Sequence, residues 1–317
     1  MPDNATIMRV VISEFMEAGA VATLESHFET VYDPGLVDHR DDLHRQLATA
    51  DALIVRNKTR VDAALLAAAP RLAAVGRLGV GLDNIDVAAC ESRGISVIPA
   101  TGANALAVAE YVIGTALLLL RGAYRSTPAV ANGKWPRGAL SHGREIAGKT
   151  LGVVGFGSIG QLTARLARAL GMHVIGFDAK IAPDDSLWSA TKTAPRKFDE
   201  VIQEADVVSL HVPLTAATRG LIDAHTLSLM KPDAILINTS RGGIVDEAAL
   251  GAALRTGKLG GAALDVFQHE PLAAGSPLAG CPHLVLTPHI AGITRESNVR
   301  VSTLIAEKIA AALLARP

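Results

Sequence analysis

The chain has 317 residues, of which 49% are hydrophobic and 3% aromatic, and its formal net charge is −1 at pH 7. This length suffices for two domains with cores of Ala, Val, Leu and Ile. A near-neutral chain lacks the basic balance typical of nucleic-acid binding, so we expect no nucleic-acid partner. The two cysteines, Cys90 and Cys281, are too few for a disulfide framework and indicate a reducing compartment.

The N-terminus shows no signal-peptide pattern, because residues 9–12 already fit a first strand. Together with the free thiols, this predicts a cytoplasmic protein. The longest apolar stretch, residues 103–120, has the length of a membrane span but contains Asn104 and Glu110. We therefore expect a helix buried between domains or subunits, and no membrane partner.

Residues 1–100 alternate short apolar runs with helical patterns. They predict strands at 9–13, 30–32, 52–55, 73–75 and 96–98, and helices at 15–28, 40–50 and 62–69. Such a βα repeat indicates a parallel sheet with helices on both faces.

A glycine-containing loop, GRLGVGLDNID at residues 76–86, lies between the last two of these strands. Its three glycines and its backbone N–H groups, placed at the carboxyl end of a strand, suit anion binding. The loop equally fits a tight βα turn in which Asp83 or Asn84 caps a helix. Both interpretations can hold at once.

The middle of the chain connects two βα series. Asn104 is expected to cap a long helix that ends near Leu120, and residues 124–144 predict a polar, loop-rich connection. Trp135, within this connection, suits a core, an interface or both.

A second βα series begins at Lys149, and its first strand ends in a glycine-rich turn. Gly155 permits a tight turn, Gly157 lets the backbone approach a pyrophosphate, and Gly160 lets helix and strand pack closely. The N-terminus of the helix predicted at 161–170 offers free N–H groups and a partial positive charge to phosphates.

An acidic residue follows this turn at the spacing that NAD binding requires. The strand predicted at 172–177 ends at Asp178, 18 residues beyond Gly160, close to the ~20 expected for the acid that binds the ribose hydroxyls. A carboxylate there also repels the 2′-phosphate of NADP. The alternative is an ordinary βαβ turn with an aspartate at the end of a strand.

The rest of the chain continues the alternation. After a polar stretch at 180–196, strands are predicted at 205–210, 234–238, 261–266 and 284–286, and helices at 221–230, 247–256 and from 294 onward. We therefore predict an α/β protein with two doubly wound parallel-sheet domains. Residues 103–289 form the continuous second domain, and residues 1–102 take back the C-terminal tail, 290–317.

Three residues of the second domain combine into a plausible reaction site. Arg241, Glu270 and His289 follow predicted strands, and ligands of open α/β sheets bind at the carboxyl ends of strands. A histidine can donate a proton to a ketone oxygen during hydride transfer, a carboxylate can stabilise its imidazolium, and an arginine can bind a substrate carboxylate. Each also has an ordinary explanation as a surface, loop or structural residue.

Six motifs make the chain similar to one family. They are GRLGVGLDNID at 76–86, GKTLGVVGFGSIG at 148–160, HVPLT at 211–215, NTSRGGIVD at 238–246, ALDVF at 263–267 with Glu270 and Pro271, and TPHIAG at 287–292. Nearly the whole chain resembles the D-isomer-specific 2-hydroxyacid dehydrogenases, particularly their phosphoglycerate dehydrogenase branch. The resemblance implies a flavodoxin-like substrate domain and a Rossmann NAD-binding domain.

The resemblance also implies roles for individual residues. Arg241 would bind the substrate carboxylate, His289 would be the acid/base, Glu270 its partner, and Asp265 would hold the nicotinamide carboxamide. The cofactor would contact Gly155, Gly157, Ser158, Ile159, Gly160, Asp178, His211, Val212, Pro213, Thr218, Thr239, Ser240, Arg241, Asp265, His289 and Gly292, and the substrate Arg56, Gly79, Val80, Gly81, Arg241 and His289.

The implied function is an NAD-dependent interconversion of a small D-configured 2-hydroxy acid and its 2-keto acid. The substrate is expected to carry a second anionic group, of the 3-phosphoglycerate or sulfolactate type. The alternatives are a glyoxylate or hydroxypyruvate reductase and, from another class, a non-catalytic NAD(H)-sensing regulator. We expect a homodimer with NAD as the cofactor and no metal.

Departures from the family pattern bear on the choice of substrate. Relatives often carry serine where this chain has Asn57, and serines where it has Ala105 and Ala107. The chain ends at Pro317, so the resemblance predicts neither the C-terminal regulatory domain of longer relatives nor feedback control by serine.

Overall fold

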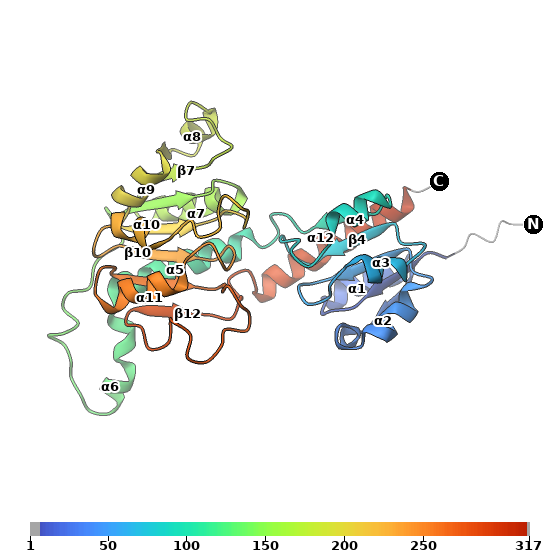
Figure 1. Ribbon diagram of the computed structural model, residues 1–317, viewed down its shortest axis with the longest axis horizontal. Coiled ribbons are helices and arrows are strands. Elements are labelled where there is room, and N and C mark those ends of the chain that lie inside the picture. The colour runs from blue at the N-terminus through green and yellow to red at the C-terminus, as the bar shows by residue number, and fades with distance from the viewer. Residues whose placement is uncertain (1–6, 316–317) are drawn as a thin grey trace, which may run out of the picture. The chain divides into compact units, whose positions relative to one another are not determined.

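The chain divides into two compact units, which are described separately. Unit 1 comprises the residues up to Asn104 and those from Ile293 onward, and unit 2 comprises Ala105–Gly292. The computed structural model describes residues 7–315, so the chain end at Pro317 lies outside the described residues. Each unit contains one parallel sheet covered by helices (Figure 1), which confirms the predicted fold class.

Unit 1 has a five-stranded sheet in the order β2-β1-β3-β4-β5, which is the flavodoxin-like order. Its strands are β1 (Arg9–Ile12), β2 (Glu29–Tyr32), β3 (Ala52–Val55), β4 (Ala74–Arg77) and β5 (Ser96–Pro99). Its helices are α1 (Ala18–Glu25), α2 (Arg40–Leu47), α3 (Ala63–Ala67), α4 (Val87–Ser92) and α12 (Arg295–Leu314), with a short 3₁₀ helix, η1 (Pro34–Asp38).

Alternating side chains divide the core of unit 1 between the two faces of its sheet. Val10 and Ile12 pack with α1 and α12, whereas Val11 packs with α2 and α3. Helix α12 approaches β4 closely because Gly76 has no side chain: a Cβ there would lie 2.8 Å from Ile305 Cγ2. The C-terminal helix therefore completes the core of the N-terminal sheet.

Unit 2 has a seven-stranded sheet in the order β12-β11-β10-β9-β6-β7-β8. Its strands are β6 (Thr150–Val154), β7 (His173–Phe177), β8 (Ala194–Pro195), β9 (Val207–Leu210), β10 (Ile235–Asn238), β11 (Gly261–Leu264) and β12 (Leu284–Leu286). Its helices are α5 (Ala105–Arg121), α6 (Thr127–Ala131), α7 (Ser158–Ala169), α8 (Ser186–Ala190), α9 (Phe198–Glu204), α10 (Ala224–Leu229) and α11 (Glu247–Arg255), with a 3₁₀ helix, η2 (Ala123–Ser126).

The strand order of unit 2 reverses between β6 and β9. Helices α5 and α7 pack on one face of the sheet, and α9, α10 and α11 on the other. Successive connections leave in opposite directions from β6 and β9, so a crevice is expected at the carboxyl ends of these two strands. The glycine-rich turn after β6 and the HVPLT segment after β9 lie at this switch point.

Several sequence predictions of local structure were wrong. Helix α1 begins at Ala18 and not at residue 15, because residues 13–17 form a loop that supports a neighbouring loop. Helix α4 is capped by Asp86, whose side chain accepts from Ala89 N, and not by Asp83 or Asn84. Helix α5 does begin after Asn104, but Asn104 Oδ1 is buried without a hydrogen bond among the described residues.

Other elements were missed or are ambiguous by composition. The polar stretch 180–196 contains α8 and β8, and α9 follows it.

None of the single helices among residues 7–315 has both the length and the hydrophobicity of a membrane span. The bent pair Ala105–Arg121 and Ala123–Ala131 meets both criteria together, by length and composition only.

Candidate active site

The glycine turn after β6 leaves the N-terminus of α7 open. Gly155 has a left-handed φ of +92°, and a Cβ there would lie 2.5 Å from His211 O. A Cβ at Gly160 would overlap Gly155 O, whereas one at Gly157 would meet nothing within 4 Å. Because Gly157 provides no side-chain cap, the N–H groups that begin at Ser158 and Ile159 are available to an anion.

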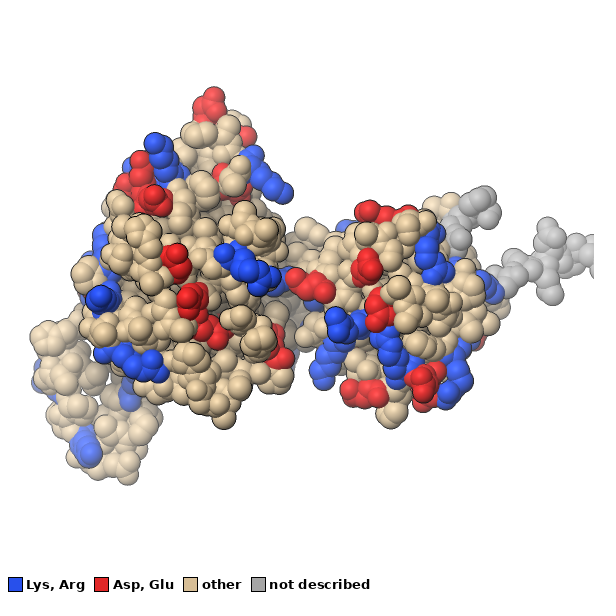
Figure 2. Space-filling view, in the orientation of Figure 1, with Lys and Arg blue, Asp and Glu red and all other residues tan. Residues whose placement is uncertain are grey.

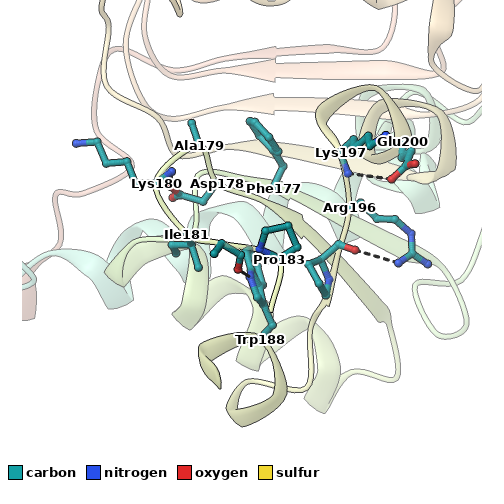
Figure 3. A pocket seen from close by; sticks show the side chains of 12 residues that line it. Phe177, Asp178, Ala179, Lys180, Ile181, Pro183, Trp188, Arg196, Lys197 and Glu200 are labelled. Carbon is teal, nitrogen blue, oxygen red and sulfur yellow. Dashed lines mark hydrogen bonds between the residues drawn. The ribbon is translucent and has the colours of Figure 1, made fainter. Parts of the chain in front are cut away.

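Asp178 lies against this turn. Its Oδ2 accepts from Phe156 N at 2.7 Å and its Oδ1 from Lys180 N at 2.8 Å. Each carboxylate oxygen has lone pairs for further donors, such as two adjacent hydroxyls. A pocket of about 780 Å³ opens beside Asp178, with the ring of Trp188 and the charged Lys180, Arg196, Lys197 and Glu200 in its lining (Figure 3).

The segment after β9 forms the opposite side of the switch point. His211 N donates to Val154 O at 2.7 Å, and His211 Nε2 lies 2.9 Å from Ser209 Oγ. Burial lowers the pKa of His211 to about 4, so its ring is neutral at pH 7. Val212 and Pro213 follow, and Thr218 Oγ1 closes the loop by donating to Pro213 O at 2.6 Å.

The segment after β10 presents a hydroxyl and a guanidinium. Buried Asn238 holds it, accepting from Ser240 N and donating to Arg241 O, each at 3.0 Å. Arg241 Nη1 donates to Ser240 O at 2.6 Å. Thr239 Oγ1 is buried without a hydrogen bond among the described residues, as expected of a hydroxyl placed to bind a polar ligand.

His289 and Glu270 form a hydrogen-bonded pair. His289 Nδ1 lies 2.8 Å from Glu270 Oε2, while Glu270 Oε1 accepts from Phe267 N at 3.0 Å. The side chains are 42% and 36% exposed, so a substrate can reach them. With Nδ1 bonded to the carboxylate, Nε2 is the ring atom that can exchange a proton with a bound molecule.

Buried Asp265 organises the loop that carries His289. Its Oδ1 accepts from Thr287 Oγ1 at 2.6 Å and from Ile290 N at 2.8 Å, and its Oδ2 accepts from Ala291 N at 2.8 Å. Gly292 follows this loop at the boundary of unit 2. Three donors within the chain thus bind the Asp265 carboxylate, and Oδ2 keeps one acceptor position for a ligand amide.

The predicted substrate residues of unit 1 lie in two connected loops. Asn84 Nδ2 donates to Arg56 O at 3.2 Å and to Thr59 O at 2.7 Å, which joins the loop after β3 to the loop containing Gly79, Val80 and Gly81. Val80 is exposed and Gly79 is buried. The hydrogen bonds of Asn84 therefore hold the two loops together within unit 1.

Arg56 is held by several neighbours within unit 1. Its Nη2 donates to Asn298 Oδ1 at 2.6 Å, and its guanidinium carbon lies 5.7 Å from the centre of the Phe15 ring. Burial lowers its pKa from the usual value, and the charges of Glu14 and Glu17 oppose that shift. Glu14 is 5% exposed and accepts from Arg56 N, Lys58 N and Thr59 N at 2.8, 3.2 and 2.9 Å.

Sequence reasoning missed the residues that support the site. Glu14, Asn238 and Thr287 are polar, occur at or just after the end of a strand and bond to loop backbone or to Asp265. Their position after an apolar run was the available signal. Among the described residues there is no group of three or more His, Cys, Asp or Glu that could hold a metal ion.

Comparisons with known proteins agree with this geometry. Residues 113–291 match the D-isomer specific 2-hydroxyacid dehydrogenase, NAD binding domain. An (S)-sulfolactate dehydrogenase of Chromohalobacter salexigens is 54% identical over 96% of this chain and 98% of its own length.

More distant relatives share the fold. A D-3-phosphoglycerate dehydrogenase of Archaeoglobus fulgidus is 38% identical over 95% of this chain, which spans 56% of that protein. The crystal structure of a glyoxylate reductase from Paecilomyes thermophila superposes with a TM-score of 0.85 at 29% identity, covering 99% of this chain and 97% of the other.

The neutral state of His211 predicts a pH dependence of stability. Its pKa is about 4 in the folded protein and 6.5 as an ordinary value, so the unfolded chain binds the extra proton between these limits. The contribution of neutral His211 to the free energy of unfolding is therefore fully present above pH 6.5 and is lost as the pH falls towards 4. At pH 5 the loss should be about 2 kcal/mol.

Urea unfolding at pH 7.5 and pH 5 measures this loss. His211→Asn should lose about 2 kcal/mol less than the wild type between the two pH values. His173→Asn, at an exposed position at the start of β7, should behave as the wild type. Equal losses in the His211 variant and the wild type would contradict the assignment.

Proposed function

The chain belongs to the D-isomer-specific 2-hydroxyacid dehydrogenases, and we propose that its substrate is a three-carbon D-type 2-hydroxy acid with a second anionic group, of the sulfolactate type. It is an NAD-dependent dehydrogenase acting on an anionic hydroxyacid. The observation that carries the proposal is the exposed His289–Glu270 pair at the carboxyl edge of the unit 2 sheet, in a chain 54% identical to an (S)-sulfolactate dehydrogenase. (S)-Sulfolactate has the spatial arrangement of a D-hydroxy acid, because sulfur reverses the priority order.

The residues of unit 2 fit the NAD cofactor. The N-terminus of α7 would take the pyrophosphate and Asp178 the adenosine ribose, while the unpartnered hydroxyl of Thr239 and the segment 211–213 would line the remainder. The other assigned contacts are Gly155, Gly157, Ser158, Ile159, Gly160, Thr218, Ser240, Arg241, Asp265, His289 and Gly292. When bound, NAD accepts or supplies the hydride at the C2 atom of the substrate.

Residues of the chain bind the substrate carboxylate and transfer the proton. Arg241 would bind the substrate carboxylate through a planar guanidinium. In reduction, His289 Nε2 gives a proton to the carbonyl oxygen, and in oxidation it takes the hydroxyl proton. Glu270 stabilises the imidazolium through the 2.8 Å contact to Nδ1 and holds the ring in one tautomer.

The second anionic group is assigned to Arg56, with Gly79, Val80 and Gly81 contributing the neighbouring loop. Glu14 supports this assignment because it accepts from Arg56 N and Thr59 N and so fixes the backbone that carries the arginine. 3-Phosphoglycerate is the other dianionic candidate. Glyoxylate or hydroxypyruvate reduction needs no second anion site, and a non-catalytic NAD(H) sensor would need no proton-transfer pair.

Two further proposals concern assembly and location. Tyr124, Val130 and Trp135 are exposed, and Trp135 is 78% exposed. They belong to the segment around α6, which extends from the body of unit 2 and carries few charges on the face shown (Figures 1 and 2). These three exposed apolar side chains support a homodimer, and the two free cysteines support a cytoplasmic location.

A substrate panel tests the function. NADH absorbance should show strong preference for (S)-sulfolactate over its enantiomer, D- and L-lactate, glycerate, 3-phosphoglycerate, and, in reverse, glyoxylate and hydroxypyruvate. Arg56→Gln should raise KM for the dianionic acid about 10-fold or more and change glyoxylate turnover little, because only the former loses a charged contact.

Other results of the panel would select other functions. Preference for 3-phosphoglycerate would identify that acid as the substrate, and broad, weak turnover of keto acids would indicate a general reductase. Tight NADH binding without turnover would indicate the sensor.

The proton-transfer pair gives a second prediction. His289→Ala should lower kcat about 10²- to 10⁴-fold, whereas His173→Ala at the opposite edge of the sheet should not. Glu270→Gln should move the alkaline limb of the reduction profile to lower pH, since an amide does not stabilise an imidazolium. Retained activity in His289→Ala would remove this residue from the mechanism.

Light scattering tests the assembly. The protein should have twice the 32.9 kDa mass of one chain, and Trp135→Asp should shift the population towards single chains. A wild-type mass equal to one chain would contradict the dimer.

A further inference from the structure

A tyrosine on an apolar helix contacts the loop that carries His289. Tyr111 lies on α5, which packs under the unit 2 sheet, and its hydroxyl is 2.6 Å from Thr287 Oγ1. Thr287 directly follows β12 and stands two residues before His289. The catalytic residues described above make no direct use of this hydroxyl.

The direction of the hydrogen bond between Tyr111 and Thr287 follows from the protons available. Thr287 has one hydroxyl proton, which its Oγ1 donates to Asp265 Oδ1 at 2.6 Å. Tyr111 is therefore the donor to Thr287. Burial and the nearby charge of Asp265 raise the pKa of Tyr111, so the phenol remains protonated and able to donate. Two hydroxyls in series thus end on the Asp265 carboxylate.

Asp265 in turn fixes the backbone of three consecutive residues. His289 N donates to Asp265 O, and Ile290 N and Ala291 N donate to its two carboxylate oxygens, all at 2.8 Å. His289 has a left-handed φ of +56°, which a residue with a side chain rarely adopts. Such a conformation persists where several contacts determine it together.

We propose that Tyr111 is a positioning residue for His289, holding Thr287 and, through it, the Asp265 carboxylate that sets the backbone of residues 289–291. The inference rests on the proposed role of His289 as the acid/base. It requires no direct contact between Tyr111 and the substrate or cofactor.

Removing the phenol oxygen should slow proton transfer more than it weakens substrate binding. Without this donor, Thr287 can rotate and Asp265 loses the fixed orientation of one of its three donors. His289 then spends less time with Nδ1 on Glu270, while Arg241 keeps its own support from Asn238. The change should therefore appear in kcat and in the pH profile.

Tyr111→Phe tests the proposal, measured with the acid that the wild type turns over fastest. We expect kcat to fall about 3- to 10-fold, KM to stay within two-fold, and the alkaline limb of the reduction profile to move to lower pH. Tyr32→Phe is the matched control: it removes a partly buried phenol hydroxyl that donates to Met16 O in unit 1, and its kcat and pH profile should match the wild type.

Hydrogen exchange gives a readout that does not depend on turnover. Amides 289–291 should exchange faster in Tyr111→Phe than in the wild type or in Tyr32→Phe, because their acceptor is less well held. Thr287→Ser keeps the hydroxyl and should retain activity and slow exchange, whereas Thr287→Val should lose both.

Distinct results would overturn the inference or the proposed function. Tyr111→Phe with wild-type kcat, pH profile and exchange overturns the positioning role. A lower melting temperature with an unchanged kcat and pH profile also overturns it, since the hydroxyl would then be structural only. Absence of wild-type turnover across the panel refutes the proposed function, while faster exchange at 289–291 would still show that Tyr111 holds the loop.

Discussion

The parallel alignment of the seven strands in unit 2 is the constraint on which its chemistry depends. Because all strands point the same way, the residue after each one emerges at the same edge of the sheet. The glycine turn, Asp178, His211, Thr239 and Asp265 directly follow their strands, and His289 lies three residues beyond β12. Six stretches of sequence far apart in the chain are thereby gathered without any of them having to cross the core.

Backbone N–H groups, rather than cationic side chains, hold most of the carboxylates that matter here. Asp178 binds two of them, Glu14 three, Asp265 two and Glu270 one. A carboxylate bound in this way orders the loop whose N–H groups it accepts from. The Glu270 carboxylate also faces an imidazole, and the Asp178 carboxylate faces the turn beside α7. The same contact type therefore serves both loop structure and site electrostatics.

The regular parts of the fold could be predicted from periodicity, and the irregular parts could not. Runs such as residues 52–55 and 235–238 are buried on both faces and read as strands from composition alone. The start of α1 was misplaced because Glu14 serves a loop 42 residues away, which no local pattern reveals. Helix α4 was expected to start too early, because Asp83, Asn84 and Asp86 all suit a cap by type and only Asp86 is in register.

Arg56 and its supports have a consequence for how such a protein changes its substrate. Glu14, Asn84 and Asn298 all belong to unit 1, whereas the support of His289 comes from Asp265, Glu270 and Thr287 in unit 2. With the proposed roles, substitutions around Arg56 would alter the acid that is recognised and leave His289 and Glu270 on an independently packed core. A point mutation near Arg56 would then change the preferred acid without first removing the proton-transfer residues, so substrate preference could diverge in single steps.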